Sequence, residues 1–250
     1  MCYNTRQSRK AKDLERYYER DRLLGEMPED QELIYNSANG FAHPNMWIIP
    51  QERPNNFIPV KWGLIPKGNL GANADEYYKN SIRYGSGLNA RSEKLFYSNQ
   101  YAPSAFTRRC IIPVDGFFEP HTAKKNGKDF KIPFYFCRKN EAPISLAGIY
   151  AVTTDKLVTF TILTKEATPL FAKIHNKKNR RPVILNDEDI DTWLSNDLDQ
   201  DEVNEVIYED LPDEELNAYP ISKDLYKRNG EADREDIIEK VEYEELEIDY

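Results

Sequence analysis

The sequence is poor in cysteine and histidine, and it contains no long run of apolar residues. Three cysteines and three histidines among 250 residues are too few and too widely spaced for a disulfide framework or a cysteine-rich zinc site. No apolar run approaches the roughly 18 residues that cross a bilayer, and the opening MCYNTRQSRKAK lacks the apolar stretch of a secretory signal. We therefore expect a protein of the reducing cytosol, with no membrane segment, no metal and no cofactor.

The composition supports a folded chain with a substantial core. Hydrophobic residues make up 40% of the sequence and charged residues 31%, which argues against wholesale disorder. The length permits one large domain or two small ones. We expect a single domain over residues 1–229, followed by an acidic tail over residues 230–250.

The net charge of −9 conceals a strong segregation of charge along the chain. Residues 186–250 contain 25 acidic and 5 basic residues, whereas residues 1–185 contain 18 acidic and 29 basic residues. A basic body of this kind is typical of proteins that bind a phosphate-bearing partner. Chance segregation of surface charge is the alternative explanation.

Strand patterns dominate the second half of the sequence. Apolar, β-branched or aromatic runs predict strands over residues 109–118, 133–137, 144–152, 157–163 and 182–185. Polar, turn-like stretches predict hairpins at residues 123–131 and 153–156. Helical patterns are confined to residues 166–174, 187–194 and 203–208. Strands joined by short turns predict an α+β fold, built on a mainly antiparallel, barrel-like sheet with a few peripheral helices.

The first half of the sequence is less regular. Apolar spacing predicts a helix over residues 8–24, with Ser8 as its N-cap and Gly25 as its stop signal. Residues 35–59 show no period and are predicted to be irregular, residues 60–65 form a short strand, and residues 66–88 form a long functional loop.

Cys2 is the residue with the most distinctive chemistry. Removal of Met1 would give Cys2 a free α-amine beside its thiol. An α-amine has a pKa of about 7.7–8.0, so a useful fraction is neutral and nucleophilic near pH 7. The amine can form an imine with an aldehyde, and the thiol can then close a five-membered thiazolidine. A cysteine at position 2 can also be incidental.

Two further residues are candidates for proton transfer. Glu119 ends the apolar run IIPVDGFFEP, where Phe117 and Phe118 are expected to raise its pKa. His175 follows a predicted helix and precedes the basic loop NKKNRRP, where it can act as a general acid or base. A solvated carboxylate and a solvated histidine are the ordinary alternatives for these two positions.

Other side chains suit a nucleic-acid ligand. Asn89 can both donate and accept hydrogen bonds, so it can orient an amine or a sugar hydroxyl. Arg91 has the geometry for bidentate phosphate contact, and Trp62 offers a ring for base stacking, although packing in the core is its default role. Further phosphate contacts are expected from the basic loop, at Lys177, Lys178, Arg180 and Arg181.

The order of the motifs resembles one family. The chain reads Met1-Cys2, then WGLIP at 62–66, NARSE at 89–93, RRCIIPVDGFFEP at 108–120, LAGIY at 146–150, FTILTKEA at 160–167 and IH…RPVIL at 174–185. Over roughly residues 1–222 this series resembles the SOS response-associated peptidase (SRAP) family, which processes abasic sites in DNA.

The resemblance implies a function and a set of roles. Cys2, freed of Met1 by self-processing, would crosslink as a thiazolidine to the ring-opened abasic site in single-stranded DNA, with lyase-type chemistry as a further activity in the DNA damage response. Asn89 would hold the reacting centre, Glu119 would move protons and His175 would assist imine chemistry. Arg91 and Trp62 would contact DNA. The resemblance also implies a monomer that needs no metal and lies with the nucleoid when bound to DNA.

The chain departs from the family pattern near the nucleophile. The family often begins Met-Cys-Gly-Arg and often has Trp after the glutamate, whereas this chain has Tyr3, Asn4 and Pro120. These departures concern DNA geometry and affinity more than the chemistry. We expect the additional cations of the basic loop to replace the lost phosphate contacts.

Two other functions remain open from the sequence. The first is a cysteine peptidase that acts on protein substrates through Cys2, His175 and Asn89. The second is a non-catalytic binder of single-stranded DNA. A peptidase would turn over many peptides, whereas a binder would show salt-dependent affinity and leave no covalent product.

Overall fold

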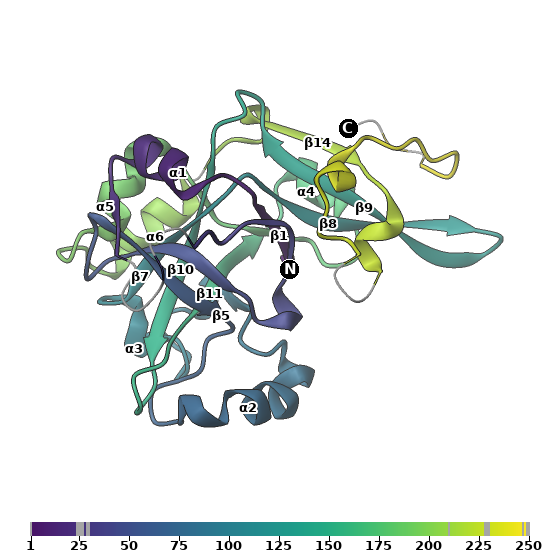
Figure 1. Cartoon of the computed structure of the whole chain (residues 1–250). Coiled ribbons are helices and arrows are strands. Elements are labelled where there is room, and N and C mark those ends of the chain that lie inside the picture. Colours follow the sequence, from purple (N-terminus) through teal and green to yellow (C-terminus); the bar gives the residue numbers. More distant parts are fainter. Residues whose placement is uncertain are drawn as a thin grey trace.

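The computed structural model describes residues 2–23, 28, 31–209, 211–227, 231–246 and 248. Its centre is a closed ring of five strands (Figure 1). Around the ring the order is β5 (Asn56–Trp62), β4 (Asn45–Pro50), β7 (Arg109–Val114), β10 (Ile144–Val152) and β11 (Val158–Glu166), which pairs back to β5. The expected α+β fold with a barrel-like sheet is therefore present.

The sheet is mixed rather than purely antiparallel. The pair that closes the barrel, β11 with β5, is parallel. Two short strands also pair in parallel, β6 (Asn89–Arg91) with β11 and β2 (Asp21–Arg22) with β5. The remaining additions, β12 (Arg180–Pro182) and β13 (Ile184–Leu185), are antiparallel. A closed ring of five strands cannot alternate direction at every pair, so one parallel pair is required.

A second sheet of five strands lies beside the barrel. Its order is β14 (Leu216–Pro220), β9 (Lys128–Arg138), β8 (Gly116–Lys125), β1 (Asn4–Gln7) and β3 (Tyr35–Asn39). Strands β8 and β9 form a long hairpin that projects from the body (Figure 1). Asn126 and Gly127 at its tip both have positive φ, 51° and 74°, as the favoured two-residue hairpin turn requires.

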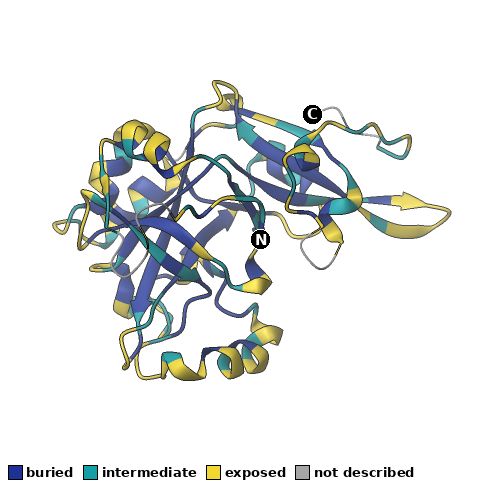
Figure 2. Ribbon diagram, in the orientation of Figure 1, coloured by how far each residue is buried: buried dark blue, intermediate teal, exposed yellow. Residues whose placement is uncertain are grey.

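The barrel strands are buried on both faces. Met46 and Ile48 of β4 join the core that contains Cys2, whereas Trp47 and Ile49 face the opposite core. The opposite core is covered by α1 (Ala11–Tyr18), α5 (Ile190–Leu194) and α6 (Gln200–Tyr208). Figure 2 shows the result, with dark blue strands inside and yellow outer faces on the helices. The shorter helices are α2 (Ala74–Ser81), α3 (Ala102–Ala105) and α4 (Pro169–Ile174).

Several predicted boundaries in the first half are wrong. The first helix begins after Lys10 rather than at Ser8, because the Ser8 hydroxyl and amide both bind Asp115 Oδ2. It ends at Tyr18, with Glu19 as its C-cap, and the predicted end at residues 24 and 25 lies outside the described residues. The stretch predicted as irregular contains β3, β4 and the start of β5. The predicted loop over residues 66–88 contains α2.

The strands of the second half agree better with the sequence. The run predicted over residues 109–118 is two strands, β7 and β8, which separate at Asp115. The predicted strand over residues 144–152 coincides with β10, and the predicted helix over residues 166–174 contains α4. Buried apolar runs give a stronger local signal than mixed ones, which explains the difference.

The described part of the acidic segment packs against the second sheet. Ile237, in the short turn Glu235–Ile238, is fully buried against Phe118 and Tyr135. The Tyr243 hydroxyl donates to the carbonyl of Ile221 at 2.7 Å. A domain boundary at residue 229 stays a prediction.

Candidate active site

Strand β1 brings the start of the chain into the interior. It lies between β3 and β8, with Asn4 opposite both Asn39 and Phe118. Because β1 and β8 run antiparallel, the chain that precedes Asn4 lies beside the chain that follows Phe118. The first residue after Phe118 is Glu119. The register therefore sets Cys2 and Tyr3 beside Glu119.

Cys2 is fully buried and held by its neighbours. Asn89 Nδ2 donates to the Cys2 carbonyl oxygen at 2.8 Å, and Cys2 Sγ donates to the Asn4 carbonyl at 3.6 Å. Burial raises the pKa of the thiol well above its ordinary value, and the charge of Glu119 raises it further. The thiol is therefore protonated near neutral pH and needs a base before it can act as a nucleophile.

Glu119 and His175 form a buried pair beside Cys2. Glu119 Oε2 lies 3.2 Å from His175 Nδ1, and both side chains are almost completely buried. Alternation along β8 places Glu119 on the same face as Phe117, which stacks on Phe136 and Phe171 within the core that contains Cys2. Loss of hydration on burial raises the pKa of Glu119 to about 7, as its apolar setting predicts.

The same burial keeps His175 neutral. Desolvation lowers its pKa to about 4, so the imidazole is uncharged at neutral pH. His175 Nδ1 lies 3.1 Å from the Arg180 carbonyl oxygen, and a carbonyl can only accept. The ring proton is therefore on Nδ1, and Nε2 carries the lone pair.

Asn89 begins β6, which β11 holds in place by the pairing of Asn89 with Ile162. Its Oδ1 is buried and accepts no hydrogen bond from the residues that the structure describes. Asn89 Nδ2 is therefore used on the Cys2 carbonyl, and Oδ1 is left as an acceptor. Such an acceptor suits the orientation of an amine on Cys2.

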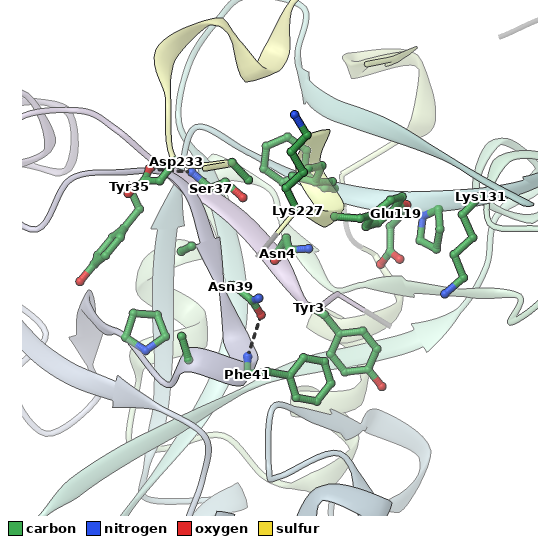
Figure 3. Close-up of a pocket in the computed structure, with 18 residues that line it drawn as sticks. Tyr3, Asn4, Tyr35, Ser37, Asn39, Phe41, Glu119, Lys131, Lys227 and Asp233 are labelled. Carbon is green, nitrogen blue, oxygen red and sulfur yellow. Dashed lines mark hydrogen bonds between the residues drawn. The ribbon is translucent and has the colours of Figure 1, made fainter. Parts of the chain in front are cut away.

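Three hollows meet at Tyr3. The largest, here the central cavity, has a volume of about 680 Å³ and is lined by Glu119 and by the segment Leu225 to Lys227 (Figure 3). The second, the histidine pocket, measures about 450 Å³ and includes His175, Lys177 and Lys178. The third, the arginine pocket, measures about 380 Å³ and includes Asn89 and Arg91. Tyr3 lines all three, although the sequence showed it only as a departure from the family.

The predicted DNA contacts divide by exposure. Arg91, Lys177 and Lys178 are exposed at the rims of these hollows. Trp62 is fully buried, with its Nε1 donating to the Leu88 carbonyl at 3.0 Å, so it offers no stacking surface and that prediction is wrong. A ring this deep packs the core beneath Gly40 and the N-terminal strand.

Two of the predicted phosphate ligands are also structural. Arg180 makes an ion pair with Glu93 at 2.5 Å, and its Nη2 donates to the Thr164 carbonyl. Arg181 is fully buried, with its guanidinium 4.7 Å from the Phe171 ring centre and 3.4 Å from Asp213. The prediction that these two arginines contact DNA is therefore wrong, because carboxylates distant in sequence hold them inside.

The described part of the chain offers neither a cluster of metal ligands nor a helix that could span a membrane. Among those residues, no group of three or more His, Cys, Asp or Glu side chains could hold a metal ion. Likewise, none of their helices has the length and apolar character needed to cross a membrane. His43 and His121 bind the carbonyls of Trp62 and Ile174 and are structural.

The chain is similar to two curated proteins over most of its length. Abasic site processing protein YobE of Bacillus subtilis is 30% identical over 204 residues, which cover 78% of this chain and 84% of that protein. Abasic site processing protein YoqW of the same organism is 29% identical over 201 residues, 78% of this chain and 82% of that protein.

The fold is also similar to that of a solved structure. A crystal structure of a protein from Bacteroides thetaiotaomicron superposes with a TM-score of 0.79 at 27% identity, over 96% of this chain and all of that one. The family model described as SOS response associated peptidase (SRAP) matches residues 1–228. On these grounds the chain belongs to the SRAP family.

Proposed function

We propose that this protein processes abasic sites in single-stranded DNA by forming a covalent adduct through Cys2 once Met1 has been removed. The observation that carries the proposal is the contact of Cys2 with Asn89, beside the buried Glu119–His175 pair. The names of the two Bacillus subtilis relatives support DNA abasic sites as the substrate class.

The first step is removal of Met1. Hydrolysis of the Met1–Cys2 peptide bond consumes one water, releases methionine and leaves an α-amine on Cys2. Glu119, with a pKa of about 7, can take a proton from the attacking water and return one to the leaving amine. The first proton transfer needs the carboxylate and the second needs the carboxylic acid. A pKa near neutral pH makes both forms available.

Amine attack then precedes thiol attack. The α-amine is substantially neutral near pH 8, whereas burial keeps the thiol of Cys2 protonated. The amine adds to the aldehyde carbon of the ring-opened sugar, and loss of one water gives an imine. Asn89 Oδ1 is placed to accept from the amine and hold its lone pair toward the aldehyde.

Ring closure completes the adduct. The thiol gives its proton to the Glu119 carboxylate or to His175 Nε2, and the sulfur adds to the imine carbon while the imine nitrogen gains a proton. The overall reaction joins aldehyde, amine and thiol into a thiazolidine with the loss of one water. None of these steps needs a redox partner.

The test uses Met1-free protein and a single strand with one abasic site. We expect an adduct that survives heating in denaturant, with a mass equal to protein plus DNA less one water. Cys2→Ala should abolish this adduct. Cys110→Ala is the matched control, since that thiol is also fully buried, and it should crosslink like the parent.

Other outcomes would replace the proposal. Normal crosslinking by Cys2→Ala would assign the nucleophile elsewhere. Multiple turnover on unrelated peptides would indicate a peptidase, and salt-sensitive binding without any covalent product would indicate a simple binder.

A further inference from the structure

The C-terminal segment, here residues 225–227 and 231–238, builds one wall of the central cavity. Leu225, Tyr226 and Lys227 line it from one side, together with Ala232 and Asp233. The opposite side is formed by Tyr3, by Phe41 and by strand β3 (Figure 3). Only Ala232 and Asp233 of this wall belong to the stretch predicted as an acidic tail, and the wall encloses space directly beside Glu119.

This wall is anchored at both ends. Asp233 Oδ1 accepts from the backbone amides of Asn36 and Ser37 at 2.6 and 3.1 Å, which ties the segment to β3. On the other side, Leu225 and Ile237 are buried in one apolar cluster with Phe118. A wall fixed in this way gives the cavity a defined shape.

The lining of the cavity suits a flat, polar-edged ring. Tyr3 and Phe41 pack with ring centres 5.0 Å apart, and Tyr226 also lines the cavity, from the C-terminal wall. Phe41 and Tyr226 remain 46% and 43% exposed, so both have ring surface to offer. Aromatic rings of this kind stack on nucleobases with little regard to sequence.

Polar side chains add the edge contacts that a base requires. Asn4 and Asn39 lie together in the middle of the cavity (Figure 3). Asn39 Oδ1 accepts from the Phe41 amide at 3.0 Å, which fixes the plane of the Asn39 amide. Lys131 lies in the lining and supplies positive charge for a phosphate. Lys227 also lies in the lining, with its Nζ paired to Asp224 at 2.9 Å.

The position of the cavity limits what can enter it. Glu119 belongs to its lining, so an occupant lies within a side chain's reach of the reacting sugar. A volume of about 680 Å³ is within the range of sites for small organic molecules, and it is too large for a sugar that has lost its base.

We propose that the central cavity binds the nucleobase of one nucleotide adjacent to the abasic site, turned out of the strand and stacked among Tyr3, Phe41 and Tyr226. This inference rests on the proposed function. It makes the C-terminal segment part of the DNA site, and it assigns Phe41 and Tyr226 as base-stacking residues. An unstacked base held this way would fix the neighbouring aldehyde at Cys2.

Equilibrium binding with an unreactive substrate tests the proposal. The probes are short single strands with a central tetrahydrofuran residue, which mimics an abasic site but has no aldehyde. One strand keeps both neighbouring bases, and two others replace the 5′ or the 3′ neighbour by a second tetrahydrofuran. Affinity is measured by fluorescence anisotropy at one salt concentration.

The expected result is a loss of DNA affinity on removal of only one of the two neighbouring bases, and this loss should depend on the cavity residues. The parent protein should lose about fivefold or more in affinity when one particular neighbouring base is removed, the low end for a stacked base, and little when the other is removed. Phe41→Ala and Tyr226→Ala should bind the complete strand about fivefold more weakly and should no longer respond to removal of that base.

A matched control and clear contrary outcomes complete the experiment. Tyr208→Ala removes a tyrosine of α6 that is 63% exposed and lines none of the three hollows, and it should behave like the parent. Equal losses on both sides, no loss on either, or an undiminished response in both cavity variants would overturn the proposal. Crosslinking of a true abasic strand by the parent protein, run in parallel, separates failure of the cavity from failure of the proposed function.

Discussion

Burial of Glu119 links the chemistry of the site to the stability of the fold. An unfolded glutamate ionises near pH 4.5, whereas in the folded protein the pKa of Glu119 is about 7. Between these values the folded state keeps a proton that the unfolded state has lost, so stability falls as pH rises through the window. His175, with its lowered pKa, acts in the opposite direction, since the unfolded state binds the extra proton.

Glu119→Gln should remove the destabilising part of this dependence. The free energy of unfolding of the variant, relative to the parent, should increase between pH 4.5 and pH 8 by about 2–3 kcal/mol. Denaturant unfolding at several pH values measures it, with the same N-terminus in both proteins. A difference that does not change with pH would show that the carboxyl is ionised throughout.

Asn89→Ala should slow crosslinking without unfolding the protein. The variant loses both the donor to the Cys2 carbonyl and the acceptor intended for the amine. Leaving the partner of a buried hydrogen bond unsatisfied costs about 1–3 kcal/mol, so the rate should fall about five- to a hundredfold in single-turnover assays. Asn186→Ala, which removes an amide bonded to Asp189, is the control, and a full rate in Asn89→Ala would remove Asn89 from the mechanism.

At the scale of elements, β1 and β6 place the reacting groups. Neither strand is long, and each depends on a partner for its position, β1 on β8 and β6 on β11. The turn before β6 contains Gly87, whose φ is 69° and whose added Cβ would lie 2.3 Å from the Leu64 carbonyl oxygen. Gly127, at the tip of the β8–β9 hairpin, has a similar φ of 74° but open space around it.

This pair of glycines gives a matched test. Gly127→Ala meets only backbone strain, about 1–2 kcal/mol, and should crosslink normally. Gly87→Ala meets the same strain and a backbone clash, so it should lose about 2–5 kcal/mol of stability and crosslink more slowly as Asn89 shifts. Thermal unfolding and adduct formation measure the two effects. Equal behaviour of the two variants would contradict this account of how β6 is placed.

At the scale of the whole molecule, the cations divide into exposed side chains beside the hollows and arginines held in ion pairs. Exposed cations at Arg91, Lys177 and Lys178 surround the hollows at Tyr3. Arg180 and Arg181 face inward to Glu93 and Asp213. Net charge counted along the sequence therefore overstates the number of cations available to a phosphate.

Salt dependence of DNA binding should reveal which cations contact phosphates. Each contact with a single strand contributes about 0.7 to the slope of log K against log salt. Replacing Lys177 and Lys178 by alanine should reduce the slope by about 1.4 if both touch phosphates. The control is Lys12→Ala, which removes an exposed lysine of α1 and should leave the slope unchanged. An unchanged slope in the double variant would show that Lys177 and Lys178 do not contact phosphates.

The sequence by itself determined which residues are proposed for the chemistry and much of the strand content. A thiol next to the initiator methionine, a carboxyl in an apolar run and the apolar strands of the second half are local features, because each depends on neighbours along the chain. The same local reasoning missed β3, a half-buried strand of the second sheet, and β4, which is buried in the barrel, because asparagine and proline interrupt this stretch of sequence.

Only the tertiary structure decided which side chains line the three hollows at Tyr3. The insertion of β1 between β3 and β8, the burial of Trp62 and the inward turn of Arg180 and Arg181 depend on residues far away in sequence. The central cavity exists because the C-terminal segment returns to the N-terminal strand. Solvent access and charge pairing are properties of the packed chain, so no periodicity along the sequence encodes them.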